Sequence, residues 1–567
     1  MPSFPPALIM LAGAVAVAVV PRFWRHWAML AFVAATLAYL FLGLEIGDEL
    51  HVQWLGFDMA VLRVDKLSLV FGSVFVIIAL IGTFFSWHMS IRGRQVAAMI
   101  YAATALGVVF AGDLLTLVVF WEAQAVASYY LIAAGGMERS LQAGTRYLFV
   151  HLVGGSALLA GVLWHYGDTG SLQFVLFDTG HASAWLILLG FAVNAAIPPF
   201  HAWLPDAYPE AGVTGTVFLS AVTTKTAVYV LARGFAGWEL LMFAGVAMAL
   251  YGIVYAMLEN DMRRLLSYHI VSQVGFMVTA IGIGGPDGIN GASAHAFAHV
   301  LYKGLLIMGV GAVMQATGRR KMTDLGGILH RMRWVFALYM IAGFSISAVP
   351  LFSGFTTKSL VIYAAEHEHI DWVVFALYLA SVGTFLSTTL KLPYGTWGGP
   401  RRDDVPVGRV PPGMYVGMVA AAVLCVGIGV YPQPLYAALP HEVTYDPYTP
   451  SHTVNSLQLL AFTFVGFMVF IRWMRPHHGI TLDTDWLYRR AAAPVRVLVQ
   501  QPLEWAFGAS ERVARRIVGT IGRAATSPEQ ALGGNEAVAL AERPWLGVAI
   551  GAVVVTVAVV TALAQLR

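Results

Sequence analysis

Long apolar runs separated by short polar segments make up most of this chain. About fifteen of them are long enough to cross a hydrocarbon core of about 30 Å as helices. The predicted helices cover residues 6–21, 26–44, 68–88, 95–111, 113–134, 146–166, 182–199, 213–235, 237–257, 264–283, 289–315, 333–350, 355–366, 371–391, 411–430, 455–474 and 543–566. This pattern predicts an all-α polytopic membrane protein with about 14–16 transmembrane helices.

Two of the apolar runs are interrupted. Residues 195–199 (AAIPP) stop one run, and the polar segment 201–210 (HAWLPDAYPE) follows before Val213 starts the next run. Residues 349–355 (VPLFSGF) open the second interrupted region. Proline removes a backbone donor, so a break at membrane depth needs protein or water around it. Paired broken helices in two halves of a chain point to an inverted-repeat transporter with its ion site near the breaks.

The order of charges predicts the domain organisation. Each half has one charge on an unbroken helix and one lysine on the second part of a broken helix: Glu122 and Lys225 in residues 95–257, Lys303 and Lys391 in residues 264–430. We therefore expect N-terminal transmembrane helices in 1–94, two repeats, and an additional transmembrane helix in 431–474. Arginines alternate with apolar residues in 475–542, which predicts an amphipathic segment at the membrane surface; an ordinary linker is the alternative. A terminal anchor helix is expected in 543–567.

Composition narrows the class of protein. The chain is 58% hydrophobic and 11% charged, with a mean hydropathy of +0.71, which excludes a soluble globular protein. A net charge of +3 gives no reason to expect a nucleic-acid partner. The single cysteine, Cys425, excludes an internal disulfide and a Cys-ligated iron–sulfur cluster. No cofactor or metal is expected, since no flavin or nucleotide motif is present either.

Loop charges predict the orientation. Short loops at 22–26, 90–94 and 138–146 are rich in arginine, whereas 45–67 is acidic. The positive-inside rule places the former in the cytoplasm and the N-terminus outside. The first run, Pro6 to Val20, lacks a basic start and a small-residue cleavage motif, so it is interpreted as a membrane helix in the bacterial cytoplasmic membrane.

Three titratable residues lie at helical spacing in one apolar run. His295, His299 and Lys303 in HAFAHVLYK are spaced i, i+4, i+8, so successive members drift only about 40° around a helix. A charge at bilayer depth is costly and usually functional. Such a stripe can hold water and pass protons, because histidine titrates near neutral pH. Two histidines hydrogen-bonded in a packed core are the alternative.

Other charges in apolar runs extend the candidate pathway. Glu122 needs a buried partner, and Lys225 is the obvious candidate; a purely structural ion pair is the alternative. Lys391 precedes Pro393 and alternatively snorkels to the membrane interface. Lys358 lies beside the second break. Two acidic residues of the polar segment, Asp206 and Glu210, are candidates for gating ion entry, with a plain connecting loop equally compatible.

Several ordered motifs resemble one known family. They are GDLLTLVVFWEAQAVASYYLI, PPFHAWLPDAYPEA, LSAVTTKTAVYVLAR, DMRRLLSYHIVSQVGF, HAFAHVLYKGLLIMGVGAV and PLFSGFTTKSL. Over residues 65–430 the chain is similar to the antiporter-like subunits of complex I, membrane-bound hydrogenases and Mrp-type cation/proton antiporters. LKLPY around Lys391 and the ending LDTDWLYRR resemble the D-type branch of the Mrp subunits.

The resemblance implies a fold and a set of pathway residues. It implies two inverted five-helix repeats, each with a broken helix and a half-channel, and a central axis of Glu and Lys residues. Glu122 stands at the family's carboxylate, Lys303 at its central lysine, and His295 and His299 at its two histidines. Lys391 is the best match for the distal exit residue, with Lys358 second. Asn194 stands where the family usually has a lysine before the first break.

These observations predict an ion-translocating subunit of an Mrp-type antiporter that works with other membrane subunits. The chain would move protons, with Na⁺ as a further possible ion, and would carry out no bond-making chemistry. The alternative is a proton-pumping subunit of a complex I-like or hydrogenase-linked assembly. A haem protein is disfavoured, because His295 and His299 lie one turn apart and cannot approach a haem from opposite faces.

Overall fold

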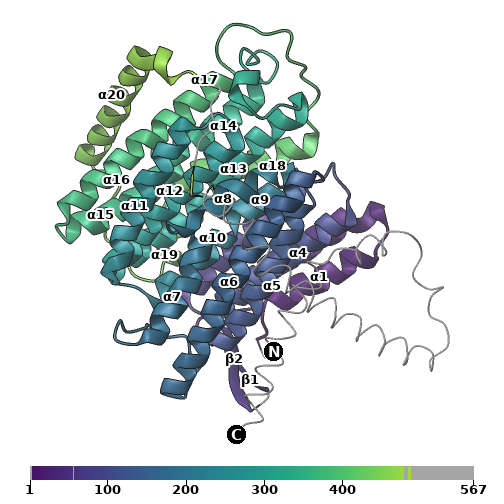
Figure 1. Cartoon of the computed structure of the whole chain (residues 1–567), viewed down its shortest axis with the longest axis vertical. Helices are drawn as coiled ribbons and strands as arrows, with labels where there is room; N and C mark the ends of the chain where they lie inside the picture. The colour runs from purple at the N-terminus through teal and green to yellow at the C-terminus, as the bar shows by residue number, and fades with distance from the viewer. Residues whose placement is uncertain (1–2, 55, 478–482, 485, 487–567) are drawn as a thin grey trace. The chain divides into compact units, whose positions relative to one another are not determined.

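The computed structural model describes residues 3–54, 56–477, 483, 484 and 486. These residues are helical except for loops and one small hairpin (Figure 1). Within them, thirteen helical segments are long and apolar enough to cross a membrane. The prediction of an all-α multi-pass membrane protein is confirmed. The predicted surface segment 475–542 lies almost wholly, and the terminal anchor 543–567 wholly, outside the described residues.

The first part of the chain supplies an antiparallel hairpin and ten helices. The hairpin, which the sequence pattern did not predict, pairs β1 (Glu49–Trp54) with β2 (Phe57–Arg63). The helices are α1 (Ala7–Val19), α2 (Arg25–Leu42), α3 (Lys66–Phe85), α4 (Arg92–Phe110), α5 (Leu114–Ala133), α6 (Glu138–Thr169), α7 (Ala182–Ala195), α8 (Trp203–Ala207), α9 (Val213–Ala221) and α10 (Thr223–Gly234).

The second part continues with α11 to α20 and one π-helix. Their bounds are α11 (Glu239–Leu258), α12 (Met262–Ile283), α13 (Gly285–Thr317), α14 (Arg333–Ile346), α15 (Ser353–His367), α16 (Asp371–Thr384), the π-helix Phe385–Lys391, α17 (Leu392–Thr396), α18 (Pro412–Val430), α19 (Gln433–Ala438) and α20 (Pro450–Met474).

Aspartates define where three of the membrane helices begin. Asp65, Asp113 and Asp261 each accept hydrogen bonds from backbone N–H groups in the first turn of α3, α5 and α12. These caps satisfy donors that have no partner within the helix. A helix start is thereby fixed at a membrane boundary, where polar backbone would otherwise enter the apolar layer.

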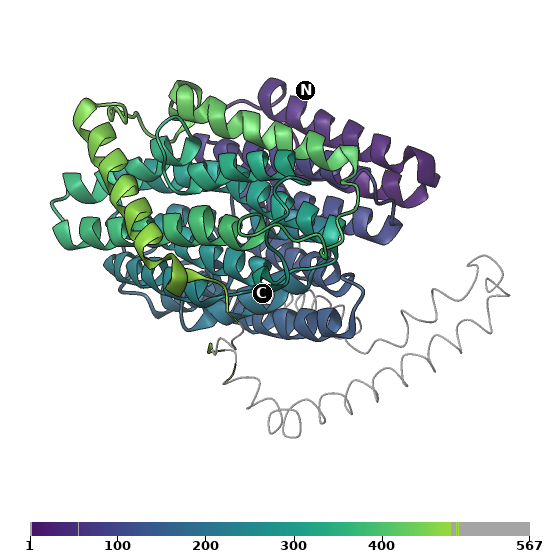
Figure 2. The same cartoon turned by 90° about the horizontal axis from the view of Figure 1, so that it is seen from above.

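Helix α13 lies at the centre of the bundle. It packs against α3, α9, α12, α14, α15 and α18, and almost all of its 33 residues are buried. The N-terminal helices α1 and α2 lie at one edge of the bundle and α20 at the opposite edge (Figures 1 and 2). Any polar group on α13 is therefore enclosed by protein rather than by lipid.

Both predicted helix breaks are present. Helix α7 ends at Ala195, where Ala196 adopts a left-handed conformation, and short helical turns follow up to Glu210. The second break separates α14, which ends at Ile346, from α15. The structure adds two interruptions that the apolar pattern did not reveal: a discontinuity at Val222 between α9 and α10, and the π-helix after α16.

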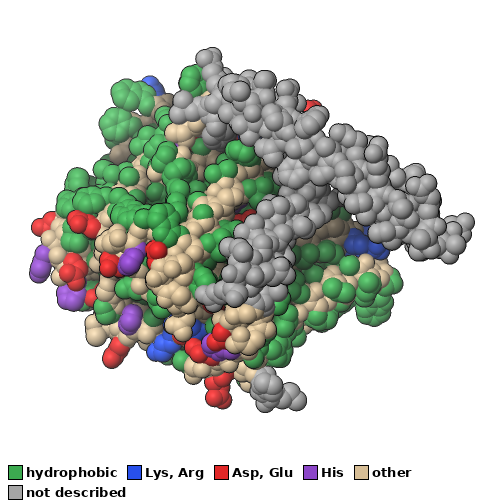
Figure 3. Space-filling model, turned by 60° about the horizontal axis from the view of Figure 1, so that its bottom comes forward, with side chains coloured by type: hydrophobic (Ala, Val, Ile, Leu, Met, Phe, Trp, Pro, Cys, Tyr) green, Lys and Arg blue, Asp and Glu red, His purple; other side chains and the backbone are tan. Residues whose placement is uncertain are grey.

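The two ends of the bundle differ in charge. Arg139, Arg264, Arg320 and Arg402 lie on loops or helix ends of one face, where they bond to neighbouring loops and helix ends. The opposite face carries the hairpin, Asp287 and the acidic and histidine residues 366–371, and acidic and histidine side chains gather on it in Figure 3. These are called the Arg-rich face and the acidic face below. The positive-inside rule predicts that the Arg-rich face is cytoplasmic.

Candidate functional site

The titratable stripe predicted on α13 is present. His295, His299 and Lys303 lie on one unbroken helix, and none of the three side chains is exposed (0%). Among the described residues, the Lys303 amine and both ring nitrogens of His299 have no hydrogen-bond partner. Buried polar atoms are nearly always hydrogen-bonded, so three unsatisfied atoms in one buried cluster mark a candidate functional site.

His295 connects the stripe to three neighbouring helices. Its Nδ1 lies 3.4 Å from Thr357 Oγ1 on α15, and its Nε2 lies 3.3 Å from the Tyr302 hydroxyl on α13. Tyr302 also donates to Gln273 Oε1 on α12 at 3.4 Å. Gln273 in turn donates to Thr384 Oγ1 at the end of α16 at 3.4 Å. The result is a chain of polar side chains that crosses α15, α13, α12 and α16.

A second set of contacts on α12 extends towards the Arg-rich face. His269, one turn before Gln273, has its Nε2 2.8 Å from Ser387 Oγ and 2.6 Å from Thr388 Oγ1 of the π-helix. His269, Gln273 and Tyr302 are not among the residues predicted from the sequence. The signal was available, because HIVSQ places a histidine and a glutamine four residues apart inside an apolar run.

Lys358 lies at the second helix break. Its amine donates to the carbonyl of Ile346, the last residue of α14, at 2.9 Å. The same amine lies 4.7 Å from the centre of the Phe276 ring, within cation–π range. The break frees a backbone carbonyl inside the bundle, and Lys358 satisfies it. This position beside the polar chain fits a pathway residue.

Lys391 lies close to the end of α11, towards the Arg-rich face. It is the last residue of the π-helix and donates to the carbonyls of Met257 and Glu259, where α11 ends on the Arg-rich face. The side chain is buried (3% exposed) and bonded to these carbonyls, so it does not snorkel to the membrane interface, the alternative left open by the sequence. Of the two lysines, Lys358 rather than Lys391 lies next to the titratable stripe.

Lys225 in the first half occupies a position that matches that of Lys358 in the second half, because both lysines lie beside a helix break. It follows the discontinuity at Val222, and its amine donates to the carbonyl of Ser220 at 2.6 Å and to Thr224 Oγ1 at 3.1 Å. It is close enough for its charge to act on His299 and Lys303. Lys225 therefore belongs to the same central cluster as the α13 stripe.

The predicted ion pair between Glu122 and Lys225 is not formed. Among the described residues, no carboxylate lies within ion-pair distance of the Lys225 amine, which is held at its own helix break. Glu122 instead lies against α6, where a Cβ added at Gly155 would approach its Oε1 to 1.6 Å. That oxygen is buried and has no hydrogen-bond partner. Nearby Val119 and Val153 are exposed, so Glu122 lies towards the outside of the bundle.

Asn194 lies next to the C-terminal end of α7. Its side chain is buried, and its Oδ1 has no hydrogen-bond partner. Neighbouring glycines of α6 contact the two positions: Gly154 packs against Val193, and Gly155 against Glu122. The rings of Trp121 on α5 and Phe191 on α7 lie 5.2 Å apart, so α5 and α7 also contact each other directly, next to Glu122 and one turn before Asn194.

The acidic residues of the polar segment form ion pairs on the Arg-rich face. Asp206 pairs with Arg146 of α6 at 2.7 Å. Glu210 pairs with Arg139 at 2.8 Å and with Arg320 at 3.0 Å, and Arg320 also pairs with Asp261. Burial by itself lowers the pKa of Arg320, but the charges of Asp261 and Glu210 outweigh it and raise that pKa. A charged network therefore joins the start of α6 to the start of α12.

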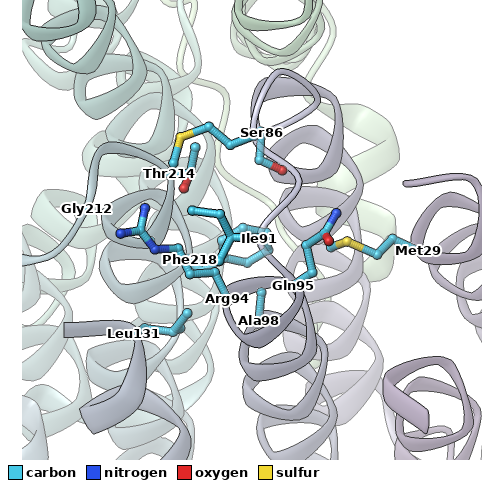
Figure 4. A pocket seen from close by; sticks show the side chains of 12 residues that line it. Met29, Ser86, Ile91, Arg94, Gln95, Ala98, Leu131, Gly212, Thr214 and Phe218 are labelled. Carbon is cyan, nitrogen blue, oxygen red and sulfur yellow. The ribbon is translucent and has the colours of Figure 1, made fainter. Parts of the chain in front are cut away.

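A separate pocket lies between α2, α4, α5 and α9, away from this axis (Figure 4). Arg94 and Gln95 of α4 line it together with Phe218 and Thr214. The Arg94 guanidinium donates to the carbonyl of Ala134 just after α5. The pocket contains none of the residues predicted to carry ions, so it is not part of the candidate pathway.

Comparisons with known proteins show which membrane proteins this chain resembles. Residues 111–387 match the family model described as NADH:quinone oxidoreductase/Mrp antiporter, transmembrane. This match supports the antiporter-like family of membrane subunits for the chain. It is 28% identical over 353 residues to the D subunit of the Na⁺/H⁺ antiporter of Alkalihalophilus pseudofirmus, and the match covers 58% of this chain and 71% of that protein.

Two further similarities extend beyond the matched residues 111–387. Hydrogenase-4 component B of Escherichia coli is 28% identical over 442 residues, which covers 70% of this chain and 66% of that protein. A chain in the structure of the Mrp complex from Dietzia sp. superposes with a TM-score of 0.70 at 23% identity, over 82% of this chain and 98% of that one. The antiporter-like fold therefore extends through most of the described helices.

Proposed function

We propose that this chain is an ion-translocating membrane subunit of a multisubunit cation/proton antiporter of the Mrp type. The observation that carries the proposal is the pair of Lys303 and His299, which is fully buried and unpartnered yet next to a hydrogen-bonded chain across four helices. Two nitrogen bases with no protein partner can exchange a proton through water. A purely structural pair would be expected to have its hydrogen bonds satisfied.

Charge interactions along the axis supply the coupling in this proposal. A proton that moves from Lys303 to His299 changes the field at Lys225 and at His295, because these charges act on one another in a low-dielectric interior. No bond between heavy atoms forms or breaks. The groups in the path are mostly nitrogen bases, whereas small metal cations are coordinated by oxygens. Protons are therefore the ions in the path, and a Na⁺ site would be shared with partner subunits.

The same proposal assigns two repeats to the chain. In 95–257, Lys225 binds a carbonyl beside the Val222 discontinuity, and in 264–430, Lys358 binds the carbonyl where α14 ends. This correspondence supports one half-pathway in each repeat. The partners are other membrane subunits of the same assembly in the bacterial cytoplasmic membrane, with the Arg-rich face in the cytoplasm.

Ion exchange in membrane vesicles that carry the complete assembly tests the function. An added Na⁺ or K⁺ gradient is expected to dissipate a pH gradient, and Lys303→Ala is expected to abolish this exchange. Lys321→Ala is the matched control, because it removes a lysine from an exposed loop outside the bundle. The proposal is wrong if no cation moves protons in vesicles where the wild-type assembly is intact.

A second function has its own support. The similarity to hydrogenase-4 component B covers more of the chain than the similarity to the antiporter protein of Alkalihalophilus pseudofirmus. In this alternative the chain is a proton-pumping subunit of a complex I-like or hydrogenase-linked assembly. Proton movement driven by hydrogen or by a quinone, with no response to Na⁺ or K⁺, would favour it over the antiporter.

A further inference from the structure

The pocket between α2, α4, α5 and α9 takes no part in the proposed ion pathway (Figure 4). It has about 450 Å³ of empty space, part of which is open to the outside. Met29, Leu131 and Phe218 form an apolar wall, and Ile91, which also lines the pocket, is 45% exposed. The pocket therefore reaches the outer surface of the bundle and has room for an apolar chain beside a few polar groups.

Gln95 has an unsatisfied amide in this pocket. Its side chain is only 4% exposed, and among the described residues neither its Nε2 nor its Oε1 has a hydrogen-bond partner. In Figure 4 this amide lies beside Met29, whereas the Arg94 guanidinium lies on the other side, next to Gly212. A buried amide without hydrogen bonds is costly and rare. Its free donor and acceptor indicate a polar ligand at this position.

Four arginines near the pocket have no carboxylate partner among the described residues. Arg22 and Arg25 lie where α2 begins, and Arg92 and Arg94 lie where α4 begins. The charges of Arg22 and Arg92 act on Arg25, so the two helix starts lie close to each other. By contrast, the arginines of α6 on the same side of the bundle pair with carboxylates. The unbalanced cluster favours an anion, and guanidinium groups bind phosphate through paired hydrogen bonds.

The position of the pocket indicates what carries this phosphate. Gly212 on its wall follows the ion-paired Glu210, so the pocket lies at the Arg-rich face. Trp24 and Trp27, at the start of α2, are exposed (57% and 50%). Exposed tryptophans are typical of the depth of the lipid headgroups, and basic pockets between membrane helices on the cytoplasmic side bind anionic headgroups. A phospholipid therefore matches both the charge and the apolar wall.

We propose that this pocket binds an anionic phospholipid, with its phosphate at Arg92 and Arg94 and its glycerol oxygens at the Gln95 amide. One acyl chain lies along the wall that contains Ile91 and Phe218. A free phosphate ion has the same charge chemistry but leaves this wall empty. In this position the lipid joins α2 to α4 and α5. The inference goes beyond the proposed function and does not depend on which ion the assembly moves.

Photo-crosslinking with lipids of defined headgroup tests the site. The whole assembly is reconstituted in phosphatidylcholine with a trace of phosphatidylglycerol that carries a photoactivatable acyl chain, and labelled fragments are identified by mass spectrometry. Labelling of α2 and α4 should exceed that by photoactivatable phosphatidylcholine at least about fivefold, which corresponds to about 1 kcal/mol, the contribution of one arginine near anionic lipid. Unlabelled phosphatidylglycerol should compete, whereas sodium phosphate should not.

Two outcomes of this experiment would overturn the proposal. Equal labelling by the two lipids would show that the pocket holds acyl chains without regard to charge. Competition by sodium phosphate would assign the arginines to a free anion and not to a lipid.

Two variants test the polar groups separately. Gln95→Leu keeps a side chain of similar size but removes the amide, and Arg92→Gln removes one exposed charge. Each is expected to lower labelling by phosphatidylglycerol about fivefold. Arg409→Gln is the matched control, because it removes an exposed arginine from a loop of the same face and should leave labelling unchanged. Normal labelling of both Gln95→Leu and Arg92→Gln would overturn the site.

Thermal unfolding of the assembly distinguishes a lipid ligand from a structural role of Gln95. Without anionic lipid, Gln95→Leu should unfold at the same or a higher temperature than the wild type, because the buried amide has no bond to lose. Added phosphatidylglycerol should raise the unfolding temperature of the wild type more than that of Gln95→Leu, since a ligand stabilises the state that binds it. A variant that is destabilised without lipid, yet responds to phosphatidylglycerol as the wild type does, would contradict the proposal.

Discussion

The two halves of the bundle hold their buried charges in different ways. In the second half, Gln273 and His295 are joined by hydrogen bonds through Tyr302, and His269 is held separately by Ser387 and Thr388 of the π-helix. In the first half, Glu122 has no hydrogen bond or ion pair among the described residues and lies towards the outside, and Asn194 is buried and neutral. Lys225 alone belongs to both halves, since its charge acts on the α13 stripe.

This difference teaches where one chain can carry protons by itself. A hydrogen-bonded chain with interspersed water provides a route without any further component. An isolated half-buried carboxylate at bilayer depth does not, because its charge has no partner to stabilise it. In the proposed function, the second half therefore supplies a pathway segment by itself, and the first half depends on charges outside its own helices.

The largest effect is expected in the second half. His269→Ala removes the group that links α12 to Ser387 and Thr388 of the π-helix. Proton transfer should fall by about a hundredfold, since relays through a positioned imidazole contribute on that order. The measurement is the initial rate of cation-driven pH change in vesicles that carry the assembly.

A matched control separates this loss from a general effect of removing histidine. His330→Ala deletes an exposed histidine in a loop of the Arg-rich face and should leave the rate unchanged. If His269→Ala retains the wild-type rate, the hydrogen-bonded chain of α12 is not the route, and the contrast between the halves loses its basis.

A smaller effect is expected when Glu122 is displaced rather than removed. Gly155→Ala places a methyl group where Glu122 Oε1 now lies, and the flexible carboxylate must move away. We expect the exchange rate to fall by about threefold, because the interaction of Glu122 with charges outside its helix weakens with distance. Gly167→Ala on the same helix is the control, since nothing lies within 4 Å of its added Cβ.

Loss in both glycine variants would point to a general distortion of α6 and would not support a role for the carboxylate. Loss in Gly155→Ala alone, reproduced by Glu122→Gln, would establish that the first half contributes through Glu122. An unchanged rate in both Gly155→Ala and Glu122→Gln would make the first half silent.

The architecture was largely predictable from the sequence, but the contacts inside the site were not. Apolar run length fixes helices, and the proline-rich segment after Ala195 and the VPLFSGF segment fix two breaks. The discontinuity at Val222 has no proline or glycine to announce it. The π-helix Phe385–Lys391 has a signal nearby, because Pro393 cannot donate a backbone hydrogen bond to Thr389, but that signal does not specify a π-helix.

The partner of a buried charge was the least predictable feature. Lys225 was expected to meet Glu122, but the nearby carbonyl of Ser220 is within its reach and satisfies its amine. Conversely, the stripe of His295, His299 and Lys303 was predictable, because it depends only on spacing within one helix. The spacing of residues along one helix therefore predicts which of them share a face in the site. Contacts between helices are not predicted, because they depend on breaks, such as the one at Val222, that have no sequence signal.

The network that joins the halves predicts an effect on stability. Arg320→Ala removes the bonds to Glu210 and Asp261 and leaves both carboxylates partly buried. The protein should lose about 2 kcal/mol of stability, the amount typical of hydrogen bonds to charged groups. Thermal unfolding of the purified assembly measures it. Arg401→Ala is the control, since that arginine pairs with Asp403 on an exposed loop.

The smallest effect is expected at Asn194. Its amide carries no charge and its Oδ1 has no partner, so Asn194→Ala should change the exchange rate by less than about twofold. The informative comparison is with Lys225→Ala, which removes a charge that acts on His299. If Asn194→Ala matches Lys225→Ala in its loss, the neutral amide orders water in the first half, and that half then conducts without a lysine on α7. If only Lys225→Ala is impaired, the contribution of the first half runs through the discontinuity at Val222 into the α13 stripe.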